Sequence, residues 1–206
     1  MKTYRGLAAS AGIAIGPALV YLPEEKSRQT PTGPVDPTSE FARLDQAIAE
    51  AQKQLSSIYE KSVAEVGEEA AAIFLAHQEF LSDPELLEEV RRQIQVQQLP
   101  ADTAVETAFE MYAQQLEALE DPYYQERALD LRDVSRRLGR ILAGVQDQET
   151  LTTLNSPVIV IARDLTPSDT AQMNKRMVLG FCTATGGLTS HTAIIARILG
   201  IPAVVG

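Results

Sequence analysis

One histidine stands where a protein could handle an anion. His191 precedes a run with helical spacing, in which Ala193, Ile194 and Ile198 are apolar. This places His191 in the first turn of the predicted helix, beside backbone N–H groups that have no partner inside the helix and at the positive end of its dipole. The loop before it holds two glycines and two residues that can cap a helix: Gly186, Gly187, Thr189 and Ser190.

This position suits a nucleophilic histidine. The positive helix end disfavours a protonated ring, and a neutral ring keeps one nitrogen lone pair for attack on a phosphoryl group. Free N–H groups at the same helix end could hold phosphate oxygens, and glycines let the backbone come close. A capped turn with an incidental histidine has the same spacing, so the residues alone leave both interpretations open.

Three motifs in order carry a family resemblance. The stretch from Gly186 to Arg197, followed by Gly200 to Gly206, resembles the phosphohistidine signature of Enzyme I of the bacterial phosphoenolpyruvate–sugar phosphotransferase system. Asp164 to Gln172 resembles a second motif of this family, and Gly67 to Leu81 resembles its carrier-binding helix. Leu188 departs from the pattern, since many relatives have arginine there, and this puts a phosphate contact from that side chain in doubt.

The resemblance implies roles for particular residues. His191 would be the phosphorylated residue and Thr170 the neighbour that orients its ring. The phosphocarrier protein HPr would dock on an apolar stripe with acidic edges, and the implied partner-binding residues are Glu68, Glu69, Ile73, His77, Phe80, Leu81 and Arg127. The position of His77 among apolar residues also favours a core or interface role over a catalytic one.

The elements that position these residues form two kinds of structure. Residues 1–22 and 145–206 predict an α/β phosphohistidine domain, because short apolar runs alternate there with turns and short helical patterns. Residues 37–144 predict a helical HPr-binding domain, and residues 23–36 a linker. The predicted fold class is therefore mixed, with a four-helix-type bundle inserted into an α/β domain.

Local signals define the elements further. Three Asp-Pro pairs, which begin at Asp36, Asp83 and Asp121, each predict a helix start with a capping carboxylate and proline at the first helical position. The expected strands are Ile13–Ile15, Ala18–Tyr21, Val158–Ile161, Met177–Thr183 and Ile201–Val205, with a short helix over Pro167–Asn174.

Composition excludes several classes of function. The net charge of −10 argues against a general binder of nucleic acid or anionic membranes. Residues 37–144 hold 21 acidic and 10 basic residues, net −11, and the rest of the chain is net +1, which fits either exposed solvated helices or a basic partner. One cysteine and two distant histidines offer no disulfide or metal cluster, and fit a cytoplasmic protein.

The resemblance also implies what lies outside this chain. Family members continue into a barrel domain that binds phosphoenolpyruvate and magnesium, so we expect a fragment without a cofactor of its own, monomeric here and homodimeric at full length. Two other functions remain open at this point. One is the swivelling phosphohistidine domain of a phosphoenolpyruvate synthase or pyruvate phosphate dikinase, and the other is a non-catalytic helical interaction module.

Overall fold

The computed structural model describes residues 2–22, 35–144, 151, 154–171, 173–174 and 176–206. The chain forms two compact units, one made of residues 1–25, 61–71 and 147–206, and the other of residues 26–60 and 72–146. Residues 61–71, which the prediction put in the helical domain, group with the sheet-containing unit. The boundary falls inside one continuous helix, where periodicity gives no signal. The predicted linker lies mostly outside the described residues.

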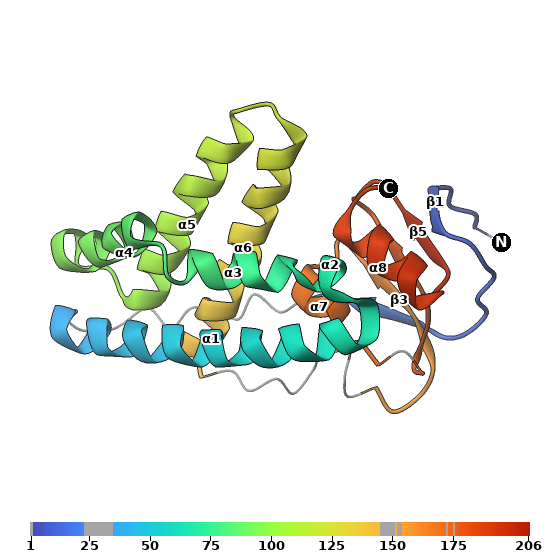
Figure 1. Cartoon of the computed structure of the whole chain (residues 1–206), viewed down its shortest axis with the longest axis horizontal. Coiled ribbons are helices and arrows are strands. Elements are labelled where there is room, and N and C mark those ends of the chain that lie inside the picture. Colours follow the sequence, from blue (N-terminus) through green and yellow to red (C-terminus); the bar gives the residue numbers. More distant parts are fainter. Residues whose placement is uncertain (1, 23–34, 145–150, 152–153, 172, 175) are drawn as a thin grey trace. The chain divides into compact units, whose positions relative to one another are not determined.

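The first unit is built on a mixed sheet (Figure 1). Its five strands among the described residues are β1 (Leu7–Ser10), β2 (Ala18–Tyr21), β3 (Val158–Ala162), β4 (Val178–Thr183) and β5 (Ala203–Val205), in the order β1-β5-β4-β3-β2. β2 runs parallel to β3, β3 to β4 and β4 to β5, whereas β1 is antiparallel to β5. The N-terminal strands thus pair with strands from the C-terminal part, as the sequence predicts for an inserted helical segment.

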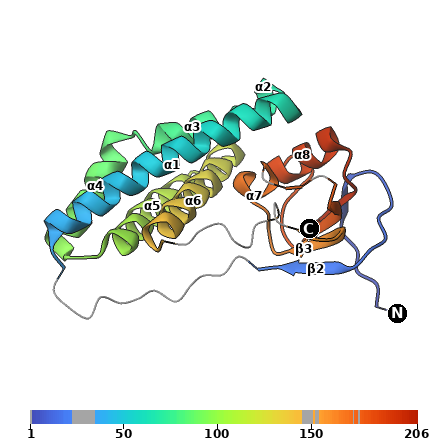
Figure 2. The ribbon, with the colours of Figure 1, turned by 90° about the horizontal axis from the view of Figure 1, so that it is seen from below.

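Helices α7 (Pro167–Ala171) and α8 (His191–Leu199) lie on one side of this sheet (Figure 2). Alternate residues of β3, namely Val158, Val160 and Ala162, share a buried core with Ala193 and Ala196 of α8. The small alanines let the helix come close to the strands, and burial of this apolar face stabilises the unit. This packing fixes where the first turn of α8 lies.

The helical elements between β2 and β3 are α1 (Pro37–Val66), α2 (Glu68–Ala71), α3 (Ile73–Phe80), α4 (Pro84–Gln97), α5 (Ala101–Glu117) and α6 (Pro122–Leu142). Three of the helices, α1, α4 and α6, begin where the Asp-Pro pairs predict. Side-chain oxygens of Asp36, Asp83 and Asp121 accept hydrogen bonds from Ser39, Leu86 and Tyr123 backbone N–H groups at 3.2, 2.9 and 2.8 Å. The mixed fold class, with helices inserted into an α/β sheet, is confirmed.

One expected strand is wrong. Ile13 to Ile15 form no strand, and the side chains of Ile13 and Ile15 are exposed. β1 begins earlier, at Leu7, because the residues that pair with β5 are Leu7, Ala8 and Ser10. Within the described residues, none of the helices is both long and apolar enough to cross a membrane.

Candidate functional site

The helix start at His191 is built as the sequence predicts. Ser190 is the N-cap of α8, with extended backbone angles, and its Oγ accepts a hydrogen bond from the Ala193 N–H at 3.3 Å. The same hydroxyl donates to the Gly187 carbonyl at 2.9 Å, which ties the cap to the loop before it. His191 is consequently the first helical residue, and Nε2 of its half-buried ring is shielded from solvent in this conformation.

The two glycines of the loop have different roles. Gly186 has a φ of 102°, in a region that residues with a side chain rarely adopt. Gly187 has no positive φ, and a Cβ added there would have no atom within 4 Å. Thr183, the last residue of β4, donates to the Thr185 carbonyl at 2.7 Å and helps to turn the chain into this loop. Only the first glycine is required by the backbone conformation.

Arg197 anchors the loop from the other end of α8. Its Nη1 donates to the Leu188 carbonyl at 2.9 Å and to the Ala9 carbonyl at 3.2 Å. A single guanidinium therefore joins the loop to β1, a contact that the sequence does not predict. The Leu188 side chain, at the position where the family pattern has arginine, is exposed.

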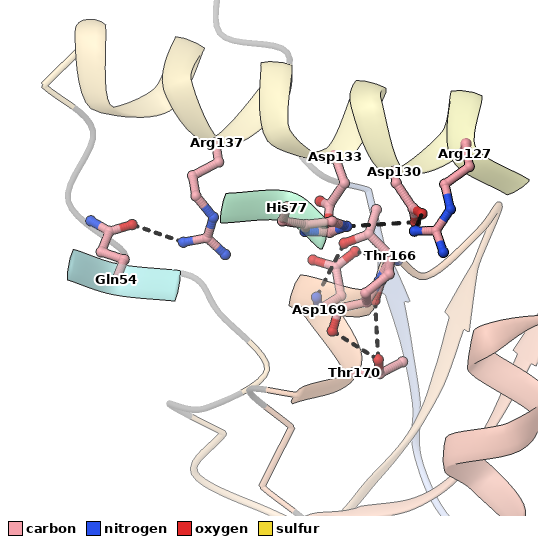
Figure 3. Close-up of polar contacts among 10 residues, drawn as sticks. Gln54, His77, Arg127, Asp130, Asp133, Arg137, Thr166, Asp169 and Thr170 are labelled. Atoms are coloured by element: carbon pink, nitrogen blue, oxygen red, sulfur yellow. Dashed lines mark hydrogen bonds and ion pairs between the residues drawn. The ribbon is translucent and has the colours of Figure 1, made fainter. Parts of the chain in front are cut away.

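Thr170 lies on a short helix with its own cap. Thr166 and Asp169 cap α7 reciprocally, because the Asp169 carboxylate accepts from the Thr166 N–H at 3.0 Å and the Thr166 hydroxyl accepts from the Asp169 N–H at 3.1 Å. The buried Thr170 hydroxyl lies within hydrogen-bonding distance of the Thr166 and Pro167 carbonyls, at 3.2 and 3.0 Å (Figure 3). The hydroxyl donates its single hydrogen to these carbonyls, so the lone pairs of its oxygen can still accept a hydrogen bond.

A buried hydrogen bond joins the α7 segment to α8. The Thr192 hydroxyl, one residue after His191, donates to the Leu165 carbonyl at 2.8 Å. α7 and α8 also pack against each other. The structure thus brings Thr170, the glycine loop and His191 into neighbouring elements of one unit.

In the helical unit, His77 lies between two carboxylates. Its Nε2 is 3.5 Å from Asp130 Oδ1 and its Nδ1 is 3.9 Å from Asp133 Oδ2, and both aspartates are on α6 (Figure 3). Arg127 Nη1 donates to the other oxygen of Asp130 at 3.1 Å. The ring of His77 is fully buried and meets Phe74 edge to face, with 5.9 Å between ring centroids.

This burial corrects part of the predicted partner surface. His77 and Leu81 have exposed fractions of 0% and 1%, so they belong to the interior, and Ile73 and Phe80 are half-buried. Within the predicted apolar stripe, His77 and Leu81 therefore pack inside the protein, whereas Ile73 and Phe80 stay partly exposed. The predicted partner residues that remain accessible are Glu68 and Glu69, which are exposed on α2, and the half-buried Ile73, Phe80 and Arg127.

Other exposed residues of the helical unit were not predicted. Leu75 on α3 is 41% exposed, and Tyr123 and Tyr124 at the start of α6 are also exposed. The Arg127 guanidinium lies over the Tyr123 ring, 5.3 Å from its centroid. Leu75 lies off the buried face of α3, which holds Phe74 and His77. A leucine outside the apolar face of a predicted helix is the sequence signal that could have pointed to this exposed position. In the part of the chain that is described, no group of three or more His, Cys, Asp or Glu could hold a metal ion.

Comparisons with known proteins define the family. Residues 5–127 match the family model described as PEP-utilising enzyme, N-terminal, and residues 154–206 match the one described as PEP-utilising enzyme, mobile domain. The first match alone spans more than half of the chain. The chain therefore belongs to the family of PEP-utilising enzymes.

Relatives and solved structures agree on a narrower group. The chain is 42% identical over 206 residues to the phosphoenolpyruvate-protein phosphotransferase of Geobacillus stearothermophilus, covering 100% of this chain and 35% of that protein. It is 42% identical over 207 residues to that of Bacillus subtilis, covering 100% of this chain and 36% of the relative. The chain thus spans about a third of the length of these curated relatives.

Two solved structures are similar. A solution NMR structure of Enzyme I has a TM-score of 0.76 and 47% identity, covering 99% of this chain and 82% of that one. A structure titled N-terminal domain of Enzyme 1 - Nitrogen has a TM-score of 0.66 and 31% identity, covering 98% and 82%. Within its family, the chain corresponds to the N-terminal part of Enzyme I.

Proposed function

We propose that this chain carries a phosphoryl group on His191 and exchanges it with a histidine of the phosphocarrier protein HPr, as part of a phosphoenolpyruvate-protein phosphotransferase. The observation that carries the proposal is the position of His191, the first residue of a helix whose cap and preceding glycine loop are held in place. The similarity of the whole of this chain to about a third of proteins named for this activity supports it. Relatives of this name do not favour a phosphoenolpyruvate synthase or a non-catalytic module.

The chemistry follows from the site. A ring nitrogen of neutral His191 attacks the phosphorus of phospho-HPr, a new P–N bond forms, and the P–N bond of the donor breaks with its electron pair returning to the donor ring. Backbone N–H groups at the start of α8 stabilise the phosphoryl oxygens. The Thr170 oxygen orients the acceptor ring. Because Nε2 is shielded in this conformation, transfer at that atom requires the ring to turn or its neighbours to move.

The helical unit supplies the proposed docking surface for HPr. Exposed Leu75, Tyr123 and Tyr124 offer apolar and aromatic contacts of the kind that dominate binding energy at interfaces. The excess of acidic residues in residues 37–144 favours encounter with a basic partner. Glu68 and Glu69 on α2 belong to the sheet-containing unit, and their exposed negative charge adds to the long-range attraction of a basic partner.

Further parts of the proposal concern the rest of the protein. Phosphoenolpyruvate and magnesium are assigned to a barrel domain outside this chain, and the full-length protein is assigned a homodimeric state in the cytoplasm. The single cysteine of the chain is compatible with a reducing compartment. These assignments rest on the family resemblance.

The test uses labelled phosphate and two histidine variants. Phospho-HPr should label the wild-type chain with an acid-labile, alkali-stable phosphate, and His191→Ala should abolish the label. His77→Gln is the matched control, since glutamine fills the buried site better than alanine and should leave the label intact. Phosphoenolpyruvate alone should give no label. A label that persists in folded His191→Ala, or its absence in folded wild type, defeats the proposal.

A further inference from the structure

A tyrosine outside the predicted site reaches the capping carboxylate of α7. Tyr21 is the last residue of β2, and its hydroxyl donates to Asp169 Oδ1 at 2.8 Å, between residues 148 positions apart in the sequence. The second oxygen of Asp169 accepts from the Thr166 N–H at 3.0 Å. The two carboxylate oxygens therefore serve different elements: one belongs to the helix cap and the other receives a bond from the sheet.

This bond matters because α7 is short. A helix of five residues is far below the length at which helices persist alone, so outside contacts must fix its position. β2, at the edge of the sheet, is placed by its parallel pairing with β3 from Ala18 to Tyr21. The Tyr21 hydroxyl transmits that placement to the first turn of α7, and a hydrogen bond to a carboxylate is stronger than one between neutral groups.

The position of α7 bears directly on the first turn of α8. Thr170 directly follows Asp169, and the loop just before α7 offers the Leu165 carbonyl to the Thr192 hydroxyl at 2.8 Å. Thr192 is the chain neighbour of His191, and both ends of that bond are buried. A shift of α7 by a few tenths of an ångström would therefore change both the distance from Thr170 to the His191 ring and the anchoring of the helix start.

We propose that Tyr21 is a positioning residue for His191, acting through Asp169 and α7. It touches neither the donor nor the reacting atoms, but it holds the short helix that presents Thr170 to the ring and anchors the start of α8. This inference deepens the proposed function and rests on it. It assigns a role in phosphoryl transfer to a residue of the N-terminal strand that no motif includes.

The test is Tyr21→Phe in the 206-residue chain, with Tyr4→Phe as the matched control, because Tyr4 is 87% exposed. Loss of the hydrogen bond from Tyr21 to Asp169, which acts on the His191 ring only through α7, should lower the maximal rate of transfer from phospho-HPr by about two- to tenfold. The phospho-HPr concentration that gives half-maximal rate should not change, since Tyr21 is not on the docking surface. Tyr4→Phe should behave as wild type.

A spectroscopic readout separates positioning from general destabilisation. Long-range ¹H–¹⁵N correlations of the His191 imidazole report its tautomer, and Tyr21→Phe should shift the tautomer ratio while amide signals away from α7 and α8 stay unchanged. In an Asp169→Ala background, adding Tyr21→Phe should have no further effect, because the carboxylate that it acts through is gone.

Three outcomes overturn the inference: a wild-type rate and imidazole spectrum in Tyr21→Phe, an equal change in Tyr4→Phe, or additive effects of Tyr21→Phe and Asp169→Ala. The imidazole spectrum needs no phosphoryl donor. If folded wild type took no label from phospho-HPr, the proposed function would fail, and the tautomer comparison would still decide whether Tyr21 positions the ring.

Discussion

At the scale of single residues, adjacent glycines in the loop before His191 differ in what they demand of the backbone. Gly186 has a φ of 102°, whereas Gly187 lacks a positive φ and has open space where a Cβ would be. A side chain at the first position would force either an unfavourable backbone conformation or a rearrangement of the loop that leads into the Ser190 cap. The second position has no such constraint.

Matched alanine variants should reveal this difference. We expect Gly186→Ala to lower the free energy of unfolding by about 1–3 kcal/mol, because the strained φ is costly for any residue with a Cβ. Gly187→Ala should stay within about 0.5 kcal/mol of wild type. Urea unfolding monitored by amide signals of the α/β unit measures both. Equal effects of the two substitutions would show that crowding or loop entropy, rather than φ, decides the role of these glycines.

Local chemistry explains which site residues could be predicted. The Ser190 cap and the placement of His191 follow from sequence spacing, because capping acts over three residues. The bonds from Tyr21 to Asp169 and from Arg197 to Ala9 join residues 148 and 188 positions apart, so no local pattern encodes them. The sequence leaves His77 open between the core and an interface, because an apolar stripe looks the same whether it faces a partner or the core, and the structure buries it.

At the scale of elements, α5 and α6 are joined by an arginine clamp. Arg132 on α6 bonds Glu110 through Nε and Nη2, each at 2.8 Å, and also bonds Glu117. These hydrogen bonds from Arg132 lower the pKa of both glutamates. The clamp fixes the register between α5 and α6. The sequence predicts where α6 starts, but it does not predict that these two helices pair.

Replacing the clamp residue should destabilise the helical unit in a pH-dependent way. Arg132→Met removes both pairs, and because the glutamates are about 40% exposed, screening limits the expected loss to about 1 kcal/mol at pH 7. A lowered pKa in the folded state means that this stabilisation is complete above about pH 4.5 and is lost as pH falls through the lowered values. Urea unfolding from pH 7 to 3 should show the gap to wild type closing.

Arg136→Met is the control for this prediction, since Arg136 is exposed on the same helix. It should change the free energy of unfolding by less than about 0.5 kcal/mol at any of these pH values. A gap between Arg132→Met and wild type that is constant from pH 7 to 3 would mean that packing of the arginine stem, and not its charge, supports the two helices.

At the scale of the whole molecule, the helical segment interrupts the sheet between two strands that lie side by side. β2 and β3 are parallel neighbours, and all residues from α1 to α6 connect them. The insertion could be predicted because hydrophobic periodicity changes near residues 37 and 144, and because capping residues mark the helix starts. The order of strands in the sheet could not, since pairing between distant segments depends on packing that spacing does not record.

The segregation of charge predicts how the partner associates. Residues 37–144 carry a net charge of −11 while the rest of the chain carries +1, and charge of one sign attracts a basic partner over distances set by the screening length. With HPr as the partner, the association rate should fall by about threefold or more between 50 and 500 mM salt, and the dissociation rate should change little. Stopped-flow mixing at several salt concentrations measures both rates.

Replacing exposed Glu68 and Glu69 by lysine should reduce the association rate more than the same replacement of exposed Glu85 and Glu88 on α4, although both pairs change the net charge equally. If the two double variants slowed association to the same extent, the net charge alone would attract the partner. The position of Glu68 and Glu69 on α2 would then have no specific effect on the association rate.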